Sequence, residues 1–154
     1  MKKKTVGWRE YVAFPDLGIE QVIAKVDSGA KTSALHTFFI EPFTGQDGRE
    51  WVRFGLHPVR KKQTPEVIAQ APVKEVRNVS DSGGHIEARF VIETEFVVGD
   101  TRFMAELTLT NREKMAYRML LGRTALREHF VVDCDLSYAQ QKPVVQDSLN
   151  QEEK

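Results

Sequence analysis

Residues 24–36 read Ala-Lys-Val-Asp-Ser-Gly-Ala-Lys-Thr-Ser-Ala-Leu-His, and this stretch decides how the rest of the chain is interpreted. It completes an apolar run that begins at Ile19 and predicts a buried strand. Asp27 stands where that strand ends, so its carboxylate is expected at the mouth of a core rather than on an open surface. Gly29 leaves room for close approach, and Ser28 can hydrogen-bond locally to hold the turn. Asp-Ser-Gly also occurs in ordinary turns, and the triplet alone favours that simpler interpretation.

Most of the remaining sequence has the pattern of β-strands. Residues 6–14 form a β-rich run that ends at a Pro-Asp-Leu-Gly turn. Residues 35–40 and 50–56 flank a loop with two glycines, which is the pattern of a hairpin. Residues 86–92 alternate apolar and polar side chains with the period of a half-buried strand. The sequence predicts an all-β, barrel-like domain of roughly eight or nine strands.

Three other segments complete the predicted organisation. Residues 59–73 are polar and contain two prolines, and we interpret them as a surface excursion. Residues 124–129 are the best helix candidate, because Thr124 can cap their N-terminus. Residues 140–154 are polar without an apolar face, which predicts a loose C-terminal tail. The predicted organisation is therefore a single domain over residues 1–139 followed by that tail.

Composition excludes several classes of protein. The chain has 154 residues, the size of one domain, with 22 basic and 22 acidic side chains. This balance argues against a general nucleic-acid or membrane-surface binder. No apolar run matches a membrane span or a secretory signal, and the single cysteine, Cys134, cannot form an intrachain disulfide. We expect a cytoplasmic protein without nucleic-acid or membrane partners.

A second motif changes the interpretation of the first. Residues 119–123, Met-Leu-Leu-Gly-Arg, resemble the hydrophobic-hydrophobic-Gly-Arg segment of retropepsin-like aspartic proteases. In that fold this segment crosses the Asp-Thr/Ser-Gly-Ala turn, and a glycine-rich flap lies between them along the chain. The resemblance implies a retropepsin-like closed β-barrel with one short C-terminal helix.

A narrower resemblance covers residues 24–36, 111–115 and 120–123. These motifs are similar to a bacterial and archaeal family that carries the label ATP-dependent zinc protease. Members of that family are associated with RimK-type ATP-grasp ligases that add glutamate to proteins. The labels themselves find no support in the motifs of this chain, which has no P-loop pattern and no His-Glu-x-x-His.

The resemblance implies a homodimeric aspartic peptidase or amidase, because retropepsins take one catalytic aspartate from each of two subunits. Asp27 is then the catalytic aspartate, and Ser28 and Gly29 complete the catalytic turn. The flap that covers the substrate would comprise Ser82, Gly83 and Gly84.

The chain departs from retropepsins beside the turn, where a further acid is frequent and Lys31 stands instead. Ala30 and Lys31 would contact the substrate there. The other basic candidates for the same cleft are His36, Arg112 and Arg123. Together they favour an acidic or glutamylated protein substrate, with an ATP-grasp glutamate ligase as a further candidate partner. Each charged side chain also has a simpler interpretation as a solvated or ion-paired residue.

Two alternatives stay open. The first is a non-catalytic module that keeps the fold in order to dock the ligase or its substrate. The second is a zinc-dependent peptidase, although the four histidines are scattered and no pair has the helical spacing of metal ligands. We expect no metal and no cofactor.

Overall fold

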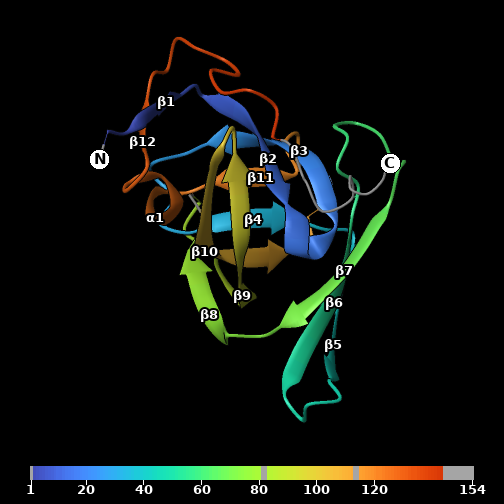
Figure 1. Cartoon of the computed structure of the whole chain (residues 1–154). Coiled ribbons are helices and arrows are strands. Elements are labelled where there is room, and N and C mark those ends of the chain that lie inside the picture. Colours follow the sequence, from blue (N-terminus) through green and yellow to red (C-terminus); the bar gives the residue numbers. More distant parts are fainter. Residues whose placement is uncertain (1, 81–82, 113–114, 144–154) are drawn as a thin grey trace.

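The computed structural model describes residues 2–80, 83–112 and 115–143, and strands dominate it (Figure 1). In chain order the strands are β1 (Lys4–Val6), β2 (Arg9–Phe14), β3 (Ile19–Val26), β4 (Ser33–His36), β5 (Phe39–Thr44), β6 (Glu50–Leu56), β7 (Val67–Pro72), β8 (Glu75–Ser80), β9 (Ile86–Val98), β10 (Thr101–Thr110), β11 (Met119–Leu121) and β12 (Phe130–Val132). A 3-10 turn, η1 (Pro15–Leu17), joins β2 to β3, and one short helix, α1 (Arg123–Leu126), follows β11. The all-β prediction is confirmed, although the helix is shorter than expected.

Six strands close into a barrel. Their hydrogen-bonded order is β10-β4-β11-β3-β2-β9, and β9 pairs with β10 again, so the ring is closed. β8 extends the same sheet from β9. β3 runs parallel to β11, which brings the strand before Asp27 beside the segment before Gly122. The closed barrel confirms the predicted architecture.

The barrel interior is filled by side chains that alternate along the strands. Ile92, Phe96 and Val98 of β9 are buried in the core, and Leu107 and Leu109 of β10 belong to the same cluster. Each such side chain contributes about 1.5–3 kcal/mol by leaving water. Glu93, which follows Ile92 on β9, is exposed, as expected for a side chain on the opposite face of the strand.

β5, β6 and β7 form a separate antiparallel sheet that projects from the barrel, and we call it the arm (Figure 1). Its strand β7 lies within residues 59–73, so the prediction of a surface excursion without a strand there is wrong. The prolines misled the prediction because Pro65 precedes β7 and Pro72 ends it, and neither interrupts the strand. Ala69 and Ala71, between them, are buried.

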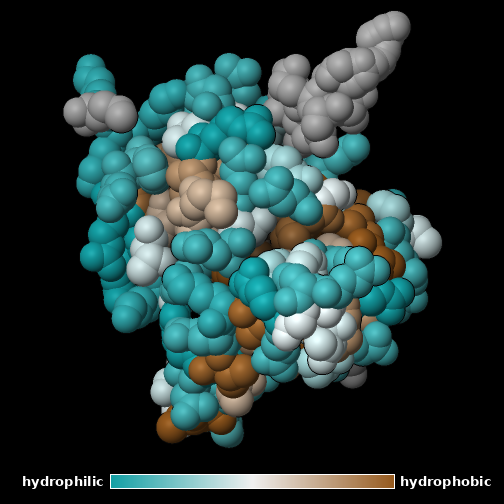
Figure 2. Space-filling model, turned by 60° about the horizontal axis from the view of Figure 1, so that its bottom comes forward, coloured by the Kyte–Doolittle hydropathy of each residue, from teal (hydrophilic) through white to brown (hydrophobic). Residues whose placement is uncertain are grey.

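The outer face of the arm carries apolar side chains. Phe43 is 36% exposed and Ile68 is 45% exposed. Trp51 is oriented by a hydrogen bond from its indole Nε1 to Asp47 Oδ1, at 3.0 Å. Figure 2 shows hydrophobic patches that interrupt the hydrophilic surface on the side of the molecule turned forward there.

The two ends of the described chain lie together. β1 pairs in parallel with β12. Glu10 is fully buried, and its carboxylate accepts backbone N–H bonds from Gly7 (2.7 Å), Ala139 (2.7 Å) and Gln140 (3.1 Å). The predicted tail therefore begins with a residue bound to the barrel, and residues 144–154 lie outside the described part. A domain boundary after residue 139 stays a prediction.

Among the described residues, no helix is long and apolar enough to cross a membrane.

Candidate active site

Asp27 lies directly after β3 in a tight turn. Its backbone N–H donates to the Leu121 carbonyl (2.9 Å), which continues the pairing of β3 with β11 by one residue. Its carboxylate accepts a hydrogen bond from the Gly29 N–H (2.9 Å), and its carbonyl accepts one from the Ala30 N–H (3.2 Å). The turn therefore fixes the direction of the Asp27 side chain, which is only partly buried.

The segment around Gly122 crosses this turn, as the motif predicted. The N–H groups of Arg123 and Thr124 donate to the carbonyls of Ala30 (2.8 Å) and Lys31 (3.0 Å). A Cβ on Gly122 would lie 2.7 Å from the carbonyl carbon of Thr32, so only glycine allows the crossing. The two motifs, distant in sequence, thus form one compact unit.

Two side chains stabilise the crossing. Arg123 Nη1 donates to the Ser28 carbonyl at 3.0 Å, so this guanidinium braces the Asp27 turn. Ser33 Oγ accepts the Gly122 N–H at 2.9 Å and is fully buried. Ser33 was not predicted as a site residue, and its position six residues after Asp27 in the same motif was the available signal.

The predicted flap is the turn of the β8–β9 hairpin. Gly83 and Gly84 lie in it and are exposed, and Gly84 has a φ of +85°, which favours glycine. Ser82 lies outside the described residues. Ile86, at the start of β9, is 70% exposed, so the hairpin presents an apolar side chain near its tip.

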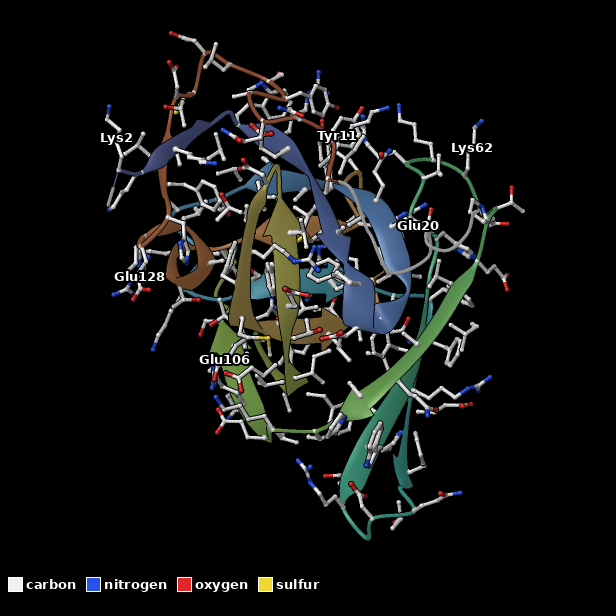
Figure 3. The ribbon with its side chains drawn as sticks, viewed as in Figure 1. Lys2, Tyr11, Glu20, Lys62, Glu106 and Glu128 are labelled. Carbon is white, nitrogen blue, oxygen red and sulfur yellow. The ribbon has the colours of Figure 1, made fainter. Side chains whose placement is uncertain are left out.

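Ion pairs connect the hairpin to the barrel. Glu106 lies on β10 (Figure 3). It accepts hydrogen bonds from Arg77 of β8 at 2.8 and 3.2 Å, and Lys74 Nζ lies 2.8 Å from its Oε2. Hydrogen bonds from Arg77 and then Lys74 lower the pKa of Glu106 to about 2. These ion pairs span β9, because β9 lies between β8 and β10 in the sheet.

His36 is buried and does not supply the positive charge expected of it. Its Nδ1 lies 2.6 Å from Thr110 Oγ1, and the side chain is 7% exposed. Burial, followed by the nearby charges of Arg89 and Arg112, lowers its pKa to about 4. At neutral pH His36 is therefore uncharged and acts as a hydrogen-bonding residue.

The basic candidates fall into two groups. Lys31 is exposed beside the crossing that Arg123 braces. Arg112 lies with His36 near the base of the hairpin, where its Nη2 is 3.8 Å from Glu87. Arg89 belongs to this second group and was not identified from the sequence, because an arginine in an alternating strand looks like an ordinary solvent-facing residue.

A metal centre is not formed in the described part of the chain. No group of three or more His, Cys, Asp or Glu side chains there could hold an ion. His57 stacks on Phe38 and His129 on Phe103, so these histidines serve packing.

Comparisons with known proteins extend these observations. A family model described as RimB-like, retropepsin-like aspartic endopeptidase RimB, matches residues 5–143. A probable alpha-L-glutamate ligase from Desulfotalea psychrophila is 44% identical over 137 residues, which are 89% of this chain and 29% of that protein. A second one, from Shewanella halifaxensis, is 42% identical over 136 residues, or 88% of this chain and 30% of that protein. The chain therefore spans less than a third of the length of these curated relatives.

A solved structure shows the same fold. A Legionella pneumophila protein of unknown function superposes with a TM-score of 0.75 at 23% identity, covering 91% of this chain and 100% of that one. The matched family model covers nearly all of the described residues, the crossing of its two motifs included. The chain belongs to the RimB-like family of retropepsin-like aspartic endopeptidases.

Proposed function

We propose that this protein is a homodimeric aspartic peptidase or amidase in which Asp27 pairs with Asp27 of a second copy. The observation that carries the proposal is the Asp27-Ser28-Gly29 turn, which the Gly122 crossing braces. This unit provides one fixed carboxylate, whereas hydrolysis of the aspartic type needs two. A two-fold axis that brings two such turns together would supply the second.

The chemistry follows from the proximity of two carboxylates. Two such groups a few Å apart cannot both ionise cheaply, so the pair shares one proton. The ionised member takes a proton from water while the water oxygen bonds to the scissile carbonyl carbon. The protonated member gives its proton to the carbonyl oxygen, which forms a tetrahedral diol. The pair then returns a proton to the nitrogen of the leaving amine as the C–N bond breaks, and the diol becomes the product carboxylic acid. Ser28 and Gly29 hold the turn during this step, and the β8–β9 hairpin covers the substrate.

An acidic or glutamylated protein is the proposed substrate. Lys31 is exposed beside the turn and Arg112 lies near the base of the hairpin, so cations line both sides of the proposed cleft. The curated relatives are named probable alpha-L-glutamate ligases, and a protein modified by such an activity would carry added glutamate. The cytoplasm is the proposed compartment, because a fold with one cysteine gains nothing from an oxidising one.

The test is Asp27→Asn, which keeps the size of the side chain and removes its ability to act as a base. We expect loss of cleavage of a glutamylated peptide by at least about a thousandfold, with the dimer preserved in sedimentation. Asp16→Asn, at an exposed carboxylate in η1, is the matched control and should keep full activity. Unchanged turnover in Asp27→Asn, or turnover by a protein that is monomeric at the assay concentration, would overturn the proposal.

A second candidate is a non-catalytic module that docks a glutamate ligase. It is favoured by the length of the curated relatives, in which the matched region is joined to a longer protein named for ligation. A wild-type protein that binds such a ligase and cleaves no glutamylated peptide would support this candidate over the peptidase.

A further inference from the structure

Two like charges lie opposite each other on the strands that lead to the Asp27 turn. Arg9 of β2 pairs with Lys25 of β3, and Lys25 stands two residues before Asp27. The chain neighbours Glu10 and Ala24 are fully buried, so the two cations lie on the outer face of the barrel. Since the Asp27 N–H continues the pairing of β3, its side chain shares a face with Lys25. Like charges directly opposite each other destabilise a sheet, so the stability of the fold does not explain this pair.

Aromatic rings hold the Arg9 guanidinium in place. Its Cζ lies 4.6 Å from the centroid of the Trp8 ring and 4.9 Å from that of Tyr138. Its Nη1 donates to Tyr117 Oη at 3.1 Å, and its Nε donates to Ser137 Oγ at 3.3 Å. Within the described part of the chain, its Nη2 has no hydrogen-bond partner, and the side chain is half-buried. The guanidinium is therefore fixed in orientation with one edge left for a ligand.

Arg60 adds a third cation, over the ring face of Tyr117. Its Cζ lies 4.2 Å from the centroid of that ring, and its Nε donates to the Ala116 carbonyl at 2.9 Å. Among the residues that the structure describes, no carboxylate forms an ion pair with Arg9, Lys25 or Arg60. The positive charge of these residues is therefore not balanced there, and a carboxylate from a ligand can balance it. We call Arg9, Lys25, Arg60 and Tyr117 the basic cluster.

The basic cluster borders the Asp27 turn. The Trp8 carbonyl accepts the N–H of Val26, the residue before Asp27, at 2.8 Å. Lys25 also pairs with Leu120 of β11, the strand that leads into the Gly122 crossing. A peptide that extends across Asp27 along this face would therefore meet these cations next to the bond that is cut.

We infer that the basic cluster is the subsite that selects acidic substrates, in which Arg9 and Lys25 bind a side-chain carboxylate of a residue next to the bond cut at Asp27. This rests on the proposed function and names the groups that recognise the substrate. Arg9 provides a planar fork for two parallel hydrogen bonds, and Lys25 provides a second charge. Because the rings already fix Arg9, little conformational entropy is lost when it binds the carboxylate.

Calorimetry on the full chain carrying Asp27→Asn measures binding without turnover. The probes are hexaglutamate and its neutral analogue hexaglutamine, both amidated at the C-terminus so that they differ only in their side-chain carboxylates. Addition of Arg9→Gln should weaken hexaglutamate binding at least about tenfold, and addition of Lys25→Gln about threefold. Neither should change hexaglutamine binding. Arg9→Lys should retain part of the preference, because lysine keeps the charge but loses the planar fork.

Arg53→Gln is the matched control. Arg53 also lies over an aromatic ring, with its Cζ 5.5 Å from the centroid of Phe39, but it belongs to the arm and pairs with Glu41 at 3.2 Å. Its variant should bind hexaglutamate like the parent.

Each outcome decides the inference. It is overturned if either Arg9→Gln or Lys25→Gln binds hexaglutamate like the parent, or if Arg53→Gln weakens binding equally. If Arg9→Gln fails to fold, as seen from its thermal unfolding, Lys25→Gln decides by the same comparison, because that side chain is exposed. Cleavage by the wild-type chain that neither substitution changes would keep the proposed function and reject this inference. Binding that depends on both cations, without any cleavage, would keep the acid-binding subsite and overturn the proposed peptidase.

Discussion

At the scale of single residues, His36 shows how the environment reverses the obvious interpretation of a side chain. In the sequence it is one of several cations near an acidic turn. In the fold it is buried against Thr110 and surrounded by arginines, so its neutral form is favoured. Burial is the largest cause of this shift, and the charges of Arg89, Arg112 and Arg118 add to it.

This environment predicts a pH dependence of stability. The pKa of His36 falls from 6.5 to about 4 on folding, so the unfolded chain binds the proton more readily. The contribution of His36 is complete above about pH 6.5 and is lost as the pH falls toward 4, by up to about 3 kcal/mol. Urea unfolding between pH 7 and 4 should show a shallower decline for His36→Asn than for the wild type. His85→Asn, at an exposed histidine, should keep the wild-type slope, and a parallel decline in both variants would contradict the prediction.

At the scale of elements, ion pairs add to sheet pairing in holding β8, the first strand of the proposed flap hairpin. Among the described strands β8 pairs with β9 alone, and the ion pairs of Glu106 with Arg77 and Lys74 connect it to β10. The same glutamate therefore positions the strand that leads into the proposed flap. Its pKa is lowered to about 2, so the connection is present above about pH 4.5 and is lost only as the pH falls toward 2.

Glu106→Gln should loosen β8 without unfolding the barrel. Removing the charge weakens both ion pairs, and a local cost of about 1 kcal/mol corresponds to roughly fivefold faster amide exchange in β8. Hydrogen exchange followed by mass spectrometry measures this, with β3 as the internal reference. Glu95→Gln breaks a comparable pair with Arg102 on the β9–β10 hairpin and should leave β8 unchanged. Equal exchange of β8 in all three proteins would show that the ion pairs do not hold it.

At the scale of the whole molecule, the two ends of the described chain are fastened to one buried carboxylate. Glu10 accepts N–H bonds from the N-terminal and the C-terminal segments, and Gln140 Nε2 donates to the Thr5 carbonyl at 2.7 Å. If either end of the described chain separates from the barrel, its N–H groups and the buried Glu10 carboxylate lose their hydrogen-bond partners. These hydrogen bonds join the two ends of the described chain, in addition to the strand pairing that closes the barrel.

Truncation tests this closure and the predicted boundary at residue 139. A chain that ends at Ala139 loses both hydrogen bonds of Gln140 and places a new carboxylate near Glu10. We expect it to unfold about 1–3 kcal/mol more easily than a chain that ends at Pro143. Urea unfolding of the two chains measures the difference. Equal stability would support a boundary at 139 and assign no role in folding to Gln140.

Local patterns in the sequence predicted the all-β, barrel-like domain, and the resemblance to retropepsins predicted the crossing of the Asp27 turn by the segment around Gly122. Alternation along residues 86–92 predicts a strand wherever it occurs. The turn at Asp27 and the glycine at position 122 are short motifs whose chemistry depends on neighbours in the chain. The two prolines around β7 misled the same kind of reasoning, since a residue pattern does not show whether proline ends a strand or interrupts it.

The tertiary structure decided everything that depends on which strands become neighbours. Nothing in the sequence marks Ser33 or Arg89 as a contact residue. The pairing of β4, β10 and β11 brings Ser33 Oγ to the Gly122 N–H and the Arg89 guanidinium to Thr108 Oγ1. The charge state of His36 could not be predicted from the sequence either, because it depends on burial and on the positions of three arginines in the fold. Contacts between residues tens of positions apart depend on strand order and register, which a local pattern restricts but does not specify.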